Sequence, residues 1–438
     1  MDRIQAVDFD PDILRIEEFP YIPPDVVYAD FTGAGQCPVS VIRAYSEDLM
    51  TTLRGNPHSI NSASLASTHR MESVRSRLLD FFNAGDEYDL VFTQNASHAL
   101  ALLGQFYPWD SKTRLILSED NHNSVHGLRE DARRVGAHFE YIEVNEEFRL
   151  QETFGERIRE NRFLYPDANL VVAYAAQSNF SGVKQPLSFV RQAHEVNADV
   201  ILDTAAYVPT HRLDLQSVQP DAAVVSFYKV LGLPTGVGAL LVRKSFLSRL
   251  SKDRFAGGTV KMVTADEYVL RSGHERFEEG TPNFGSIPLL KFVLDFIEKI
   301  GGIDAIGRHV QHLTTELLKG LNDVENVQIY GPRTMESRGG TISLNVLRSG
   351  DECVPHREIV EAAGESNISL RGGCFCNPIV GAKALGLGSE EGGRLIQLAR
   401  EADEIEMPGA VRLSLGLANT SSDIVRIIEF VRRVARKY

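Results

Sequence analysis

The chain has 438 residues, of which 43% are hydrophobic and 24% are charged, with a formal net charge of −13 at pH 7. This composition is ordinary for a globular protein of two or three domains, and the acidic balance argues against nucleic acid or an anionic membrane as a partner. No apolar run approaches the roughly 18 residues that span a bilayer. The first ten residues lack the basic and then apolar pattern of a signal peptide, so the expected location is cytoplasmic.

Short apolar runs alternate with helical stretches between about residues 90 and 242. This alternation predicts an α/β domain with a mostly parallel sheet covered by helices on both faces. Ligands of such sheets bind beyond the C-terminal ends of the strands. We interpret as strands the runs 90–93, 115–117, 170–174, 200–202, 222–225 and 239–242, and as one of the intervening helices the segment 190–196.

The pattern changes after about residue 292. Two helical stretches flank Gly301 and Gly302, and they are followed by candidate strands at 341–346 and 411–415. The segment 423–438 has apolar residues on one helical face, and either Ser421 or Ser422 is the expected N-cap. We therefore predict a large domain over 37–292 and a smaller α+β domain made of 1–36 and 293–438.

Lys229 follows an apolar run that ends in Ser226. Its side-chain amine is thereby placed at the start of a loop that contains glycines. Upstream, the run 200–202 ends in Asp203. An amine and a carboxylate at neighbouring strand ends suit pyridoxal phosphate (PLP). The amine forms a Schiff base with its aldehyde, and the carboxylate pairs with the pyridinium nitrogen so that the ring stays an electron sink. Taken alone, Ser-x-x-Lys is a weak signal, and a surface lysine is the alternative.

Three further segments follow predicted strands. The turn at 95–97 leads into a helix, whose free amides and hydroxyl suit a phosphate, although Asn95 or Ser97 can equally cap the helix. His122 is placed either to stack on a pyridine ring or to lie in a solvated loop. Asn179 is placed either to hydrogen-bond the phenolic oxygen of the cofactor or to form a turn.

Eight short motifs extend this pattern almost from end to end of the chain. They are Tyr28-Ala29-Asp30, the segments 55–59, 120–122, 177–182, 226–229, 257–260 and 276–281, and Arg371-Gly-Gly-Cys374-Phe-Cys376-Asn-Pro378. In number and order they resemble class V aminotransferase-fold enzymes of the cysteine desulfurase type, and within that group the N-terminal domain of molybdenum cofactor sulfurases. The resemblance implies the type I PLP-dependent transferase fold and a homodimer with shared active sites.

The resemblance also implies a role for each matching residue. Lys229, Asp203, His122 and Cys376 would be catalytic, with Lys229 carrying the Schiff base, Asp203 on the pyridinium nitrogen and His122 stacked on the ring. The cofactor would also be held by Asn179 at the phenolic oxygen, by Ala96, Ser97 and Ser226 around the phosphate, by Tyr228, and by Thr259 of the neighbouring subunit. The substrate would be bound by Arg371, Asn179 and His58.

Arg371 and Cys376 are the residues expected to act on the substrate. A guanidinium meets both oxygens of an α-carboxylate, and Cys376 lies five residues further on in a glycine-rich loop. By resemblance, Arg371 holds the substrate carboxylate and Cys376 accepts the sulfur. A surface arginine is the alternative for Arg371. A metal site is the alternative for Cys374 and Cys376, but Cys37 and Cys353 show no paired spacing that would complete four ligands, so we expect no metal.

The sequence departs from the family at several positions. Tyr228 stands where desulfurases commonly have histidine, and Ala206 where they commonly have glutamine. Ile379-Val-Gly-Ala382 replaces the cysteine that usually follows Cys-Phe-Cys in the sulfurases, and the sequence stops at Tyr438 without their C-terminal molybdopterin-binding domain. These departures favour a desulfurase that acts alone over delivery of sulfur to the molybdenum cofactor.

The expected function is therefore a PLP-dependent cysteine desulfurase. It would convert L-cysteine to L-alanine and pass the sulfur through a Cys376 persulfide to an unidentified acceptor. A PLP-dependent C–S lyase or another amino-acid enzyme stays open, since Lys229, Asp203 and Arg371 fit it equally well. A non-enzymatic sulfur-carrier scaffold is the other alternative, and the intact Lys229 and Asp203 argue against it.

Overall fold

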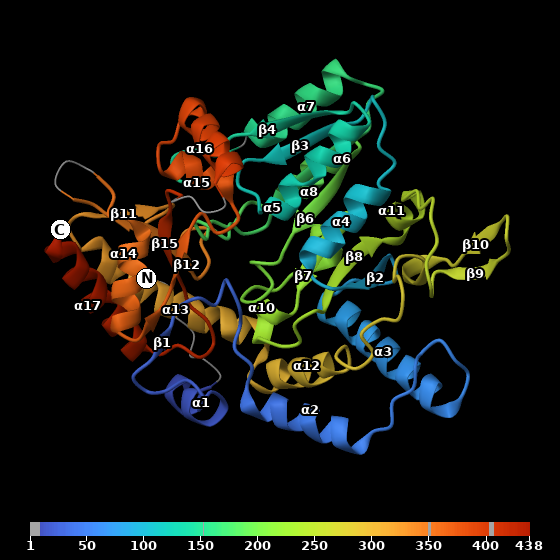
Figure 1. Cartoon of the computed structure of the whole chain (residues 1–438), viewed down its shortest axis with the longest axis horizontal. Coiled ribbons are helices and arrows are strands. Elements are labelled where there is room, and N and C mark those ends of the chain that lie inside the picture. Colours follow the sequence, from blue (N-terminus) through green and yellow to red (C-terminus); the bar gives the residue numbers. More distant parts are fainter. Residues whose placement is uncertain (1–8, 152, 349–351, 403–406) are drawn as a thin grey trace.

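A seven-stranded sheet lies at the centre of the larger part of the molecule, in a computed structural model that describes residues 9–151, 153–348, 352–402 and 407–438 (Figure 1). The strand order is β2-β8-β7-β6-β5-β3-β4, and only β8 runs antiparallel to its neighbours. The mostly parallel sheet and its six predicted strands are confirmed, and β4 is an addition. The bounds are β2 (Tyr88–Thr93), β3 (Arg114–Ser118), β4 (His138–Ile142), β5 (Leu170–Ala175), β6 (Ala198–Asp203), β7 (Ala222–Ser226) and β8 (Gly238–Arg243).

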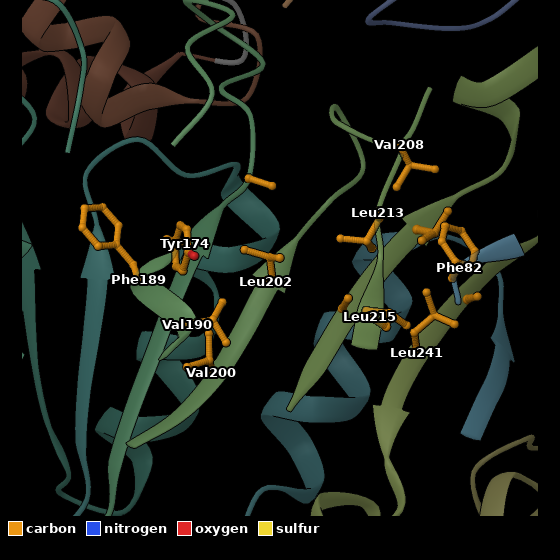
Figure 2. Close-up of a cluster of buried hydrophobic side chains, with 14 of the residues drawn as sticks. Phe82, Tyr174, Phe189, Val190, Val200, Leu202, Val208, Leu213, Leu215 and Leu241 are labelled. Atoms are coloured by element: carbon orange, nitrogen blue, oxygen red, sulfur yellow. The ribbon is translucent and has the colours of Figure 1, made fainter. Parts of the chain in front are cut away.

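Both faces of this sheet are buried under helices. Successive side chains of a strand point to opposite sides, so each strand contributes to two apolar clusters. Val171 and Ala173 of β5 join one apolar cluster, whereas Val172 and Tyr174 join the other. Figure 2 shows part of the second cluster, where Tyr174 lies between Phe189 and Leu202. The first cluster is covered by α4 (Ala96–Phe106), α6 (Leu128–Arg134) and α11 (Lys244–Arg249), and the second by α3 (Ser62–Phe81), α7 (Thr153–Leu164) and α8 (Ser188–His194).

A second, antiparallel sheet of order β11-β12-β15-β14 forms the smaller part. Apolar side chains from the N-terminal segment 14–41 share one core with those of the C-terminal part. This shared core agrees with an N-terminus that joins the small domain, but the boundaries at 36/37 and 292/293 stay predictions. The elements around it are α1 (Pro11–Glu18), β1 (Val27–Tyr28), α2 (Val39–Thr51), α12 (Leu289–Lys299), α13 (Gly302–Asn322), β11 (Val327–Tyr330), β12 (Thr341–Val346), α14 (His356–Glu365), β13 (Ile368–Ser369), β14 (Arg371–Gly373), β15 (Ala410–Ser414) and α17 (Ser421–Lys437).

Two predicted helix ends differ from the structure. The N-cap of α17 is Thr420, whose extended backbone and N–H bond to Asp423 Oδ2 (3.2 Å) place Ser421 already inside the first turn. The predicted N-cap at Ser421 or Ser422 was therefore wrong. The helix predicted over 190–196 is α8, which lies two residues earlier, and Asn197 takes a left-handed φ of 55° just before β6.

The remaining elements are short, and some of them lie away from the two sheets. The hairpin of β9 (Val260–Val263) and β10 (Tyr268–Leu270) projects from the body of the molecule (Figure 1). Within the described residues, no helix is both long and apolar enough to cross a membrane. The other short elements are α5 (Asn123–His126), α9 (Leu215–Val218), α10 (Tyr228–Leu231), η1 (Gly273–Arg276), α15 (Pro378–Ala384) and α16 (Ser389–Glu401).

Candidate active site

A pocket of about 580 Å³ lies at the C-terminal ends of the parallel strands. Asp203 is the last residue of β6, Ser226 is the last residue of β7, and Ala175 is the last residue of β5. Such strand ends form the usual ligand crevice of α/β sheets. Eight residues singled out from the sequence line this one pocket: Ala96, Ser97, His122, Asn179, Asp203, Ser226, Tyr228 and Lys229.

Lys229 lies in α10, one short turn beyond β7, and is half-buried. Its burial lowers the pKa of its amine, and the nearby guanidinium of Arg412 lowers that pKa further, whereas the Asp203 carboxylate raises it. A lowered pKa leaves more of the amine neutral at pH 7, which is the form that attacks an aldehyde.

Asp203 provides the first test of whether the pocket suits PLP. Its side chain is 8% exposed, and Oδ1 accepts the N–H of Ala205 at 2.9 Å. Oδ2 accepts no hydrogen bond from the described residues, and the side chain lines the pocket. A carboxylate oxygen that faces the pocket without a donor suits the protonated ring nitrogen of the cofactor.

The start of α4 provides the second test. Ser226 Oγ accepts the N–H of Ala96 at 2.9 Å, and the hydroxyls of Ser97 and Ser124 lie 2.6 Å apart. Asn95 caps the helix by accepting the N–H of His98 at 2.9 Å. Capping by Asn95 is therefore observed, and the hydroxyls gathered at this helix N-terminus, which favours anions, suit a phosphate, whose binding here stays a prediction.

His122 lines the same pocket and caps α5. Its Nδ1 accepts the backbone N–H of Ser124 at 3.1 Å, so a neutral ring carries its proton on Nε2. Burial lowers the pKa of His122, and the cations of Lys229 and Arg412 lower it further, against the opposing effect of Asp203. The ring is therefore uncharged at neutral pH, and its stacking on the cofactor stays a prediction.

Cys376 lies in the loop between β14 and α15, and its side chain is exposed. Phe375 and Cys376 both have φ of 58°, which non-glycine residues rarely adopt. Two hydrogen bonds hold this strained backbone: Asn179 Nδ2 donates to Phe375 O at 2.6 Å, and Asn123 N–H donates to Cys376 O at 2.7 Å. The thiol is thus tied to residues beside the Lys229 pocket.

A buried polar network continues behind this loop. Asn377 Nδ2 donates to Asp120 Oδ1 at 2.6 Å and also lies 3.2 Å from Asn179 Oδ1. Ser178 Oγ donates to the same Asp120 oxygen at 2.7 Å. Burial raises the pKa of Asp120 to about 6 despite these donors. The sequence placed Asp120 in a family motif but gave it no role.

Two arginines meet at Asp30. Arg371 is half-exposed, and its Nε and Nη2 donate to Asp30 Oδ2 at 2.9 and 2.7 Å. Arg412 is 2% exposed, and it donates from Nη2 to Asp30 Oδ1 at 2.8 Å and from Nη1 to Asn179 O at 3.0 Å. Arg412 affects the pKa values of both His122 and Lys229, so it lies close to the pocket. Arg412 has no role in the sequence-based prediction, although a charge inside the predicted strand 411–415 was a usable signal.

Thr259 and His58 do not line this pocket. Thr259 Oγ1 donates to Ala256 O at 2.9 Å, and His58 Nε2 lies 3.1 Å from Gly280 O. A Cβ on Gly258 would lie 3.0 Å from His58, so the two predicted residues are neighbours at the base of the β9–β10 hairpin. Their roles stay predictions, as does the absence of a metal; the described residues contain no cluster of three or more His, Cys, Asp or Glu side chains suited to one.

Comparisons with known proteins agree with this geometry. Residues 27–427 match the model of the family "Aminotransferase class-V". The chain is 32% identical to the molybdenum cofactor sulfurases of Homo sapiens and Solanum lycopersicum over 95% and 96% of its own length, and it spans 50% and 56% of those relatives. A cysteine desulfurase from Thermococcus onnurineus NA1, solved in its apo form, superposes with a TM-score of 0.82 at 25% identity over 98% of both chains. The cysteine desulfurase CsdA from Escherichia coli shares the fold, with a TM-score of 0.79 at 21% identity over 98% of this chain and 99% of that chain.

The fold and the pocket thus define a class V aminotransferase-fold enzyme, and the family implies PLP as its cofactor. This chain belongs to the class-V aminotransferase family. Its sequence is similar to molybdenum cofactor sulfurases and its fold to cysteine desulfurases, which confirms the predicted family and fold class.

Proposed function

We propose that this protein is a PLP-dependent cysteine desulfurase, which converts L-cysteine to L-alanine and takes the sulfur onto Cys376. The observation that carries the proposal is the exposed Cys376, held by Asn179 and Asn123 beside the pocket of Lys229. The likeness to proteins named molybdenum cofactor sulfurase and cysteine desulfurase supports sulfur transfer.

The residues of the pocket would hold the cofactor at several points. Lys229 would bind its aldehyde, Asp203 its ring nitrogen, and Asn179 its phenolic oxygen, while His122 would cover the ring. When bound, PLP supplies an electron sink for negative charge at the substrate Cα. The phosphate would be held by Ala96, Ser97 and Ser226 at the start of α4.

The chain's own groups account for the remaining steps. Arg412 and Arg371 would bind the substrate carboxylate, since Asp30 orients both guanidiniums. Lys229, with its lowered pKa, would take the Cα proton. The Cys376 thiolate then attacks the substrate sulfur, the S–S bond forms as the C–S bond breaks, and protonation of the carbon yields alanine. In balance, one thiol and one cysteine give one persulfide and one alanine.

The test follows the products formed from L-cysteine with and without a thiol reductant. We expect alanine and a persulfide that reductant releases as sulfide. Cys376→Ser should abolish the persulfide and lower alanine formation at least about a hundredfold, because the sulfur acceptor is lost. Cys374→Ser is the matched control two residues away and should retain activity. Native alanine formation in Cys376→Ser would refute the persulfide role.

Pyruvate and ammonia in place of alanine would instead identify a C–S lyase, the alternative that fits the same Lys229 and Asp203. A preparation that shows no PLP absorption band would identify a non-enzymatic scaffold. A band that is unchanged in Lys229→Ala would do the same.

We also propose a homodimer in which Thr259 and His58 serve the neighbouring subunit's site. Both lie at the base of the projecting hairpin, which exposes apolar side chains such as Met262 (65%) and Val269 (57%). Light scattering should give a mass of twice 48.6 kDa. A monomer that is fully active would contradict this arrangement.

A further inference from the structure

A second pocket, of about 850 Å³, lies between the loop after β6 and helix α13, outside the site described above. Its walls are rich in cationic side chains, and they include one carboxylate, Asp304. It adjoins another cavity, which Lys229 lines. Thr210 and Gly340 line both cavities. The charged and titratable residues that line it are Lys184, Tyr207, His211, Arg212, Asp304, Arg308 and Arg338.

Arg338 is a buried cation without an anionic partner among the described residues. It is 1% exposed, and its guanidinium donates to the backbone carbonyls of Pro332, Tyr330 (3.2 Å) and Thr341 (3.3 Å). Its Nε has no hydrogen-bond partner in the described part of the chain. Burial, reinforced by Arg149, lowers its pKa to about 9, so it stays charged at neutral pH. A buried charge left without a counter-charge is costly, and a bound anion would offset that cost.

Lys184 adds a second cation. Its Nζ lies 3.2 Å from His211 Nε2, and Thr210 Oγ1 lies 2.9 Å from His211 Nδ1. Burial and the neighbouring Lys184 lower the pKa of His211 to about 3, so the ring is neutral and serves as an acceptor. No carboxylate of the described residues lies within 4.0 Å of the Lys184 amine, and burial lowers its pKa.

Arg212 adds a third cation at the rim. It is exposed, and no hydrogen bond or ion pair of its side chain occurs among the described residues. Asp304 alone does not balance the combined charge of Lys184, Arg212 and Arg338. The guanidiniums of Arg212 and Arg338 and the ammonium of Lys184, in a pocket that Arg308 also lines, match a dianion better than a single carboxylate.

We propose that this pocket binds a phosphate group, either as the free ion or on a phosphate monoester. The site is separate from the phosphate seat at α4 and goes beyond the proposed desulfurase function. A bound phosphate would bridge the loop that follows β6 and helix α13, with Arg338 and Lys184 on the inner wall and Arg212 at the opening.

The test is calorimetric titration of the PLP-loaded enzyme, in which the cofactor's own phosphate seat is filled, with inorganic phosphate and with glycerol 3-phosphate at constant ionic strength. We expect at least one of them to bind, and the tighter one identifies the source. Arg212→Gln and Lys184→Gln should each weaken binding about tenfold, the size of one charge-assisted hydrogen bond. Arg43→Gln, an exposed arginine on α2, is the matched control and should not change it.

Absence of binding by both compounds, or equal affinity in the wild type and both pocket variants, would overturn the proposal. Alanine formation from L-cysteine should be unchanged in Arg212→Gln, because this residue is outside the Lys229 pocket. The phosphate site and the desulfurase function can therefore fail separately.

Discussion

Asn377 donates a hydrogen bond from Nδ2 to Asp120 Oδ1 at 2.6 Å, and both side chains are buried. Asp120 follows β3 of the large sheet, whereas Asn377 directly follows the candidate nucleophile, Cys376. This bond therefore ties the thiol loop to the end of a strand in the other sheet. The position of Cys376 depends on a carboxylate that belongs to neither the substrate nor the cofactor.

The first prediction concerns the titration of Asp120. Its pKa is about 6 in the folded protein, against an ordinary value near 4 in the unfolded chain. Because this pKa is raised on folding, protonation of Asp120 stabilises the folded protein. The stabilisation is complete below the pKa of the unfolded chain and is lost as pH rises through about 6. Relative to Asp120→Asn, which cannot titrate, the wild type should lose roughly 1 kcal/mol between about pH 5 and 7. Chemical unfolding of both proteins at each pH measures this, and a constant difference would contradict it.

The sequence predicted the Lys229 pocket well because its parts obey a local rule. Apolar runs mark parallel strands, and the polar residue that ends each run, such as Asp203, must lie at one edge of the sheet. No local rule pairs Asp30 with Arg412, which are 382 positions apart. Their contact exists only in the assembled fold, because Asp30 follows β1 and Arg412 lies in β15. For the same reason the sequence suggested Arg371 for the substrate carboxylate and missed the more deeply buried Arg412.

The second prediction uses the close packing at Gly33. A Cβ there would overlap Asp30 Oδ2 and would lie 2.7 Å from Arg371 Nη2. Gly33→Ala must therefore displace the Asp30 carboxylate, and with it the guanidiniums that it orients. We expect a KM for L-cysteine raised about tenfold, the effect of one misplaced charge-assisted hydrogen bond. Steady-state kinetics measure this, with Gly364→Ala as the control, since its Cβ would meet nothing within 4 Å. Equal KM values in the two variants would contradict it.

The third prediction concerns a buried ion pair that supports the sheet. Arg75 of α3 pairs with Glu278 at 2.8 Å, and Glu278 Oε1 also accepts the N–H of Phe92 at 2.7 Å. Both side chains are almost fully buried. Arg75→Met leaves the carboxylate buried without its cation and should cost about 3–5 kcal/mol of stability. Arg77→Gln, on the same helix but in a more exposed pair, should cost less than about 1 kcal/mol. Urea unfolding of both variants compares them, and similar losses would contradict the prediction.

The last prediction distinguishes the two arginines at Asp30. Arg412 is buried and donates to Asn179 O, whereas Arg371 is half-exposed and is screened by water. If Arg412 is the main ligand of the substrate carboxylate, Arg412→Lys should raise the KM for L-cysteine more than tenfold, because an ammonium lacks the guanidinium fork. Arg371→Lys should raise it less than Arg412→Lys does. The absorption band of bound PLP should persist in both variants, since neither arginine lines the cofactor pocket. A larger KM effect from Arg371→Lys would reverse the assignment and restore the residue that the sequence suggested.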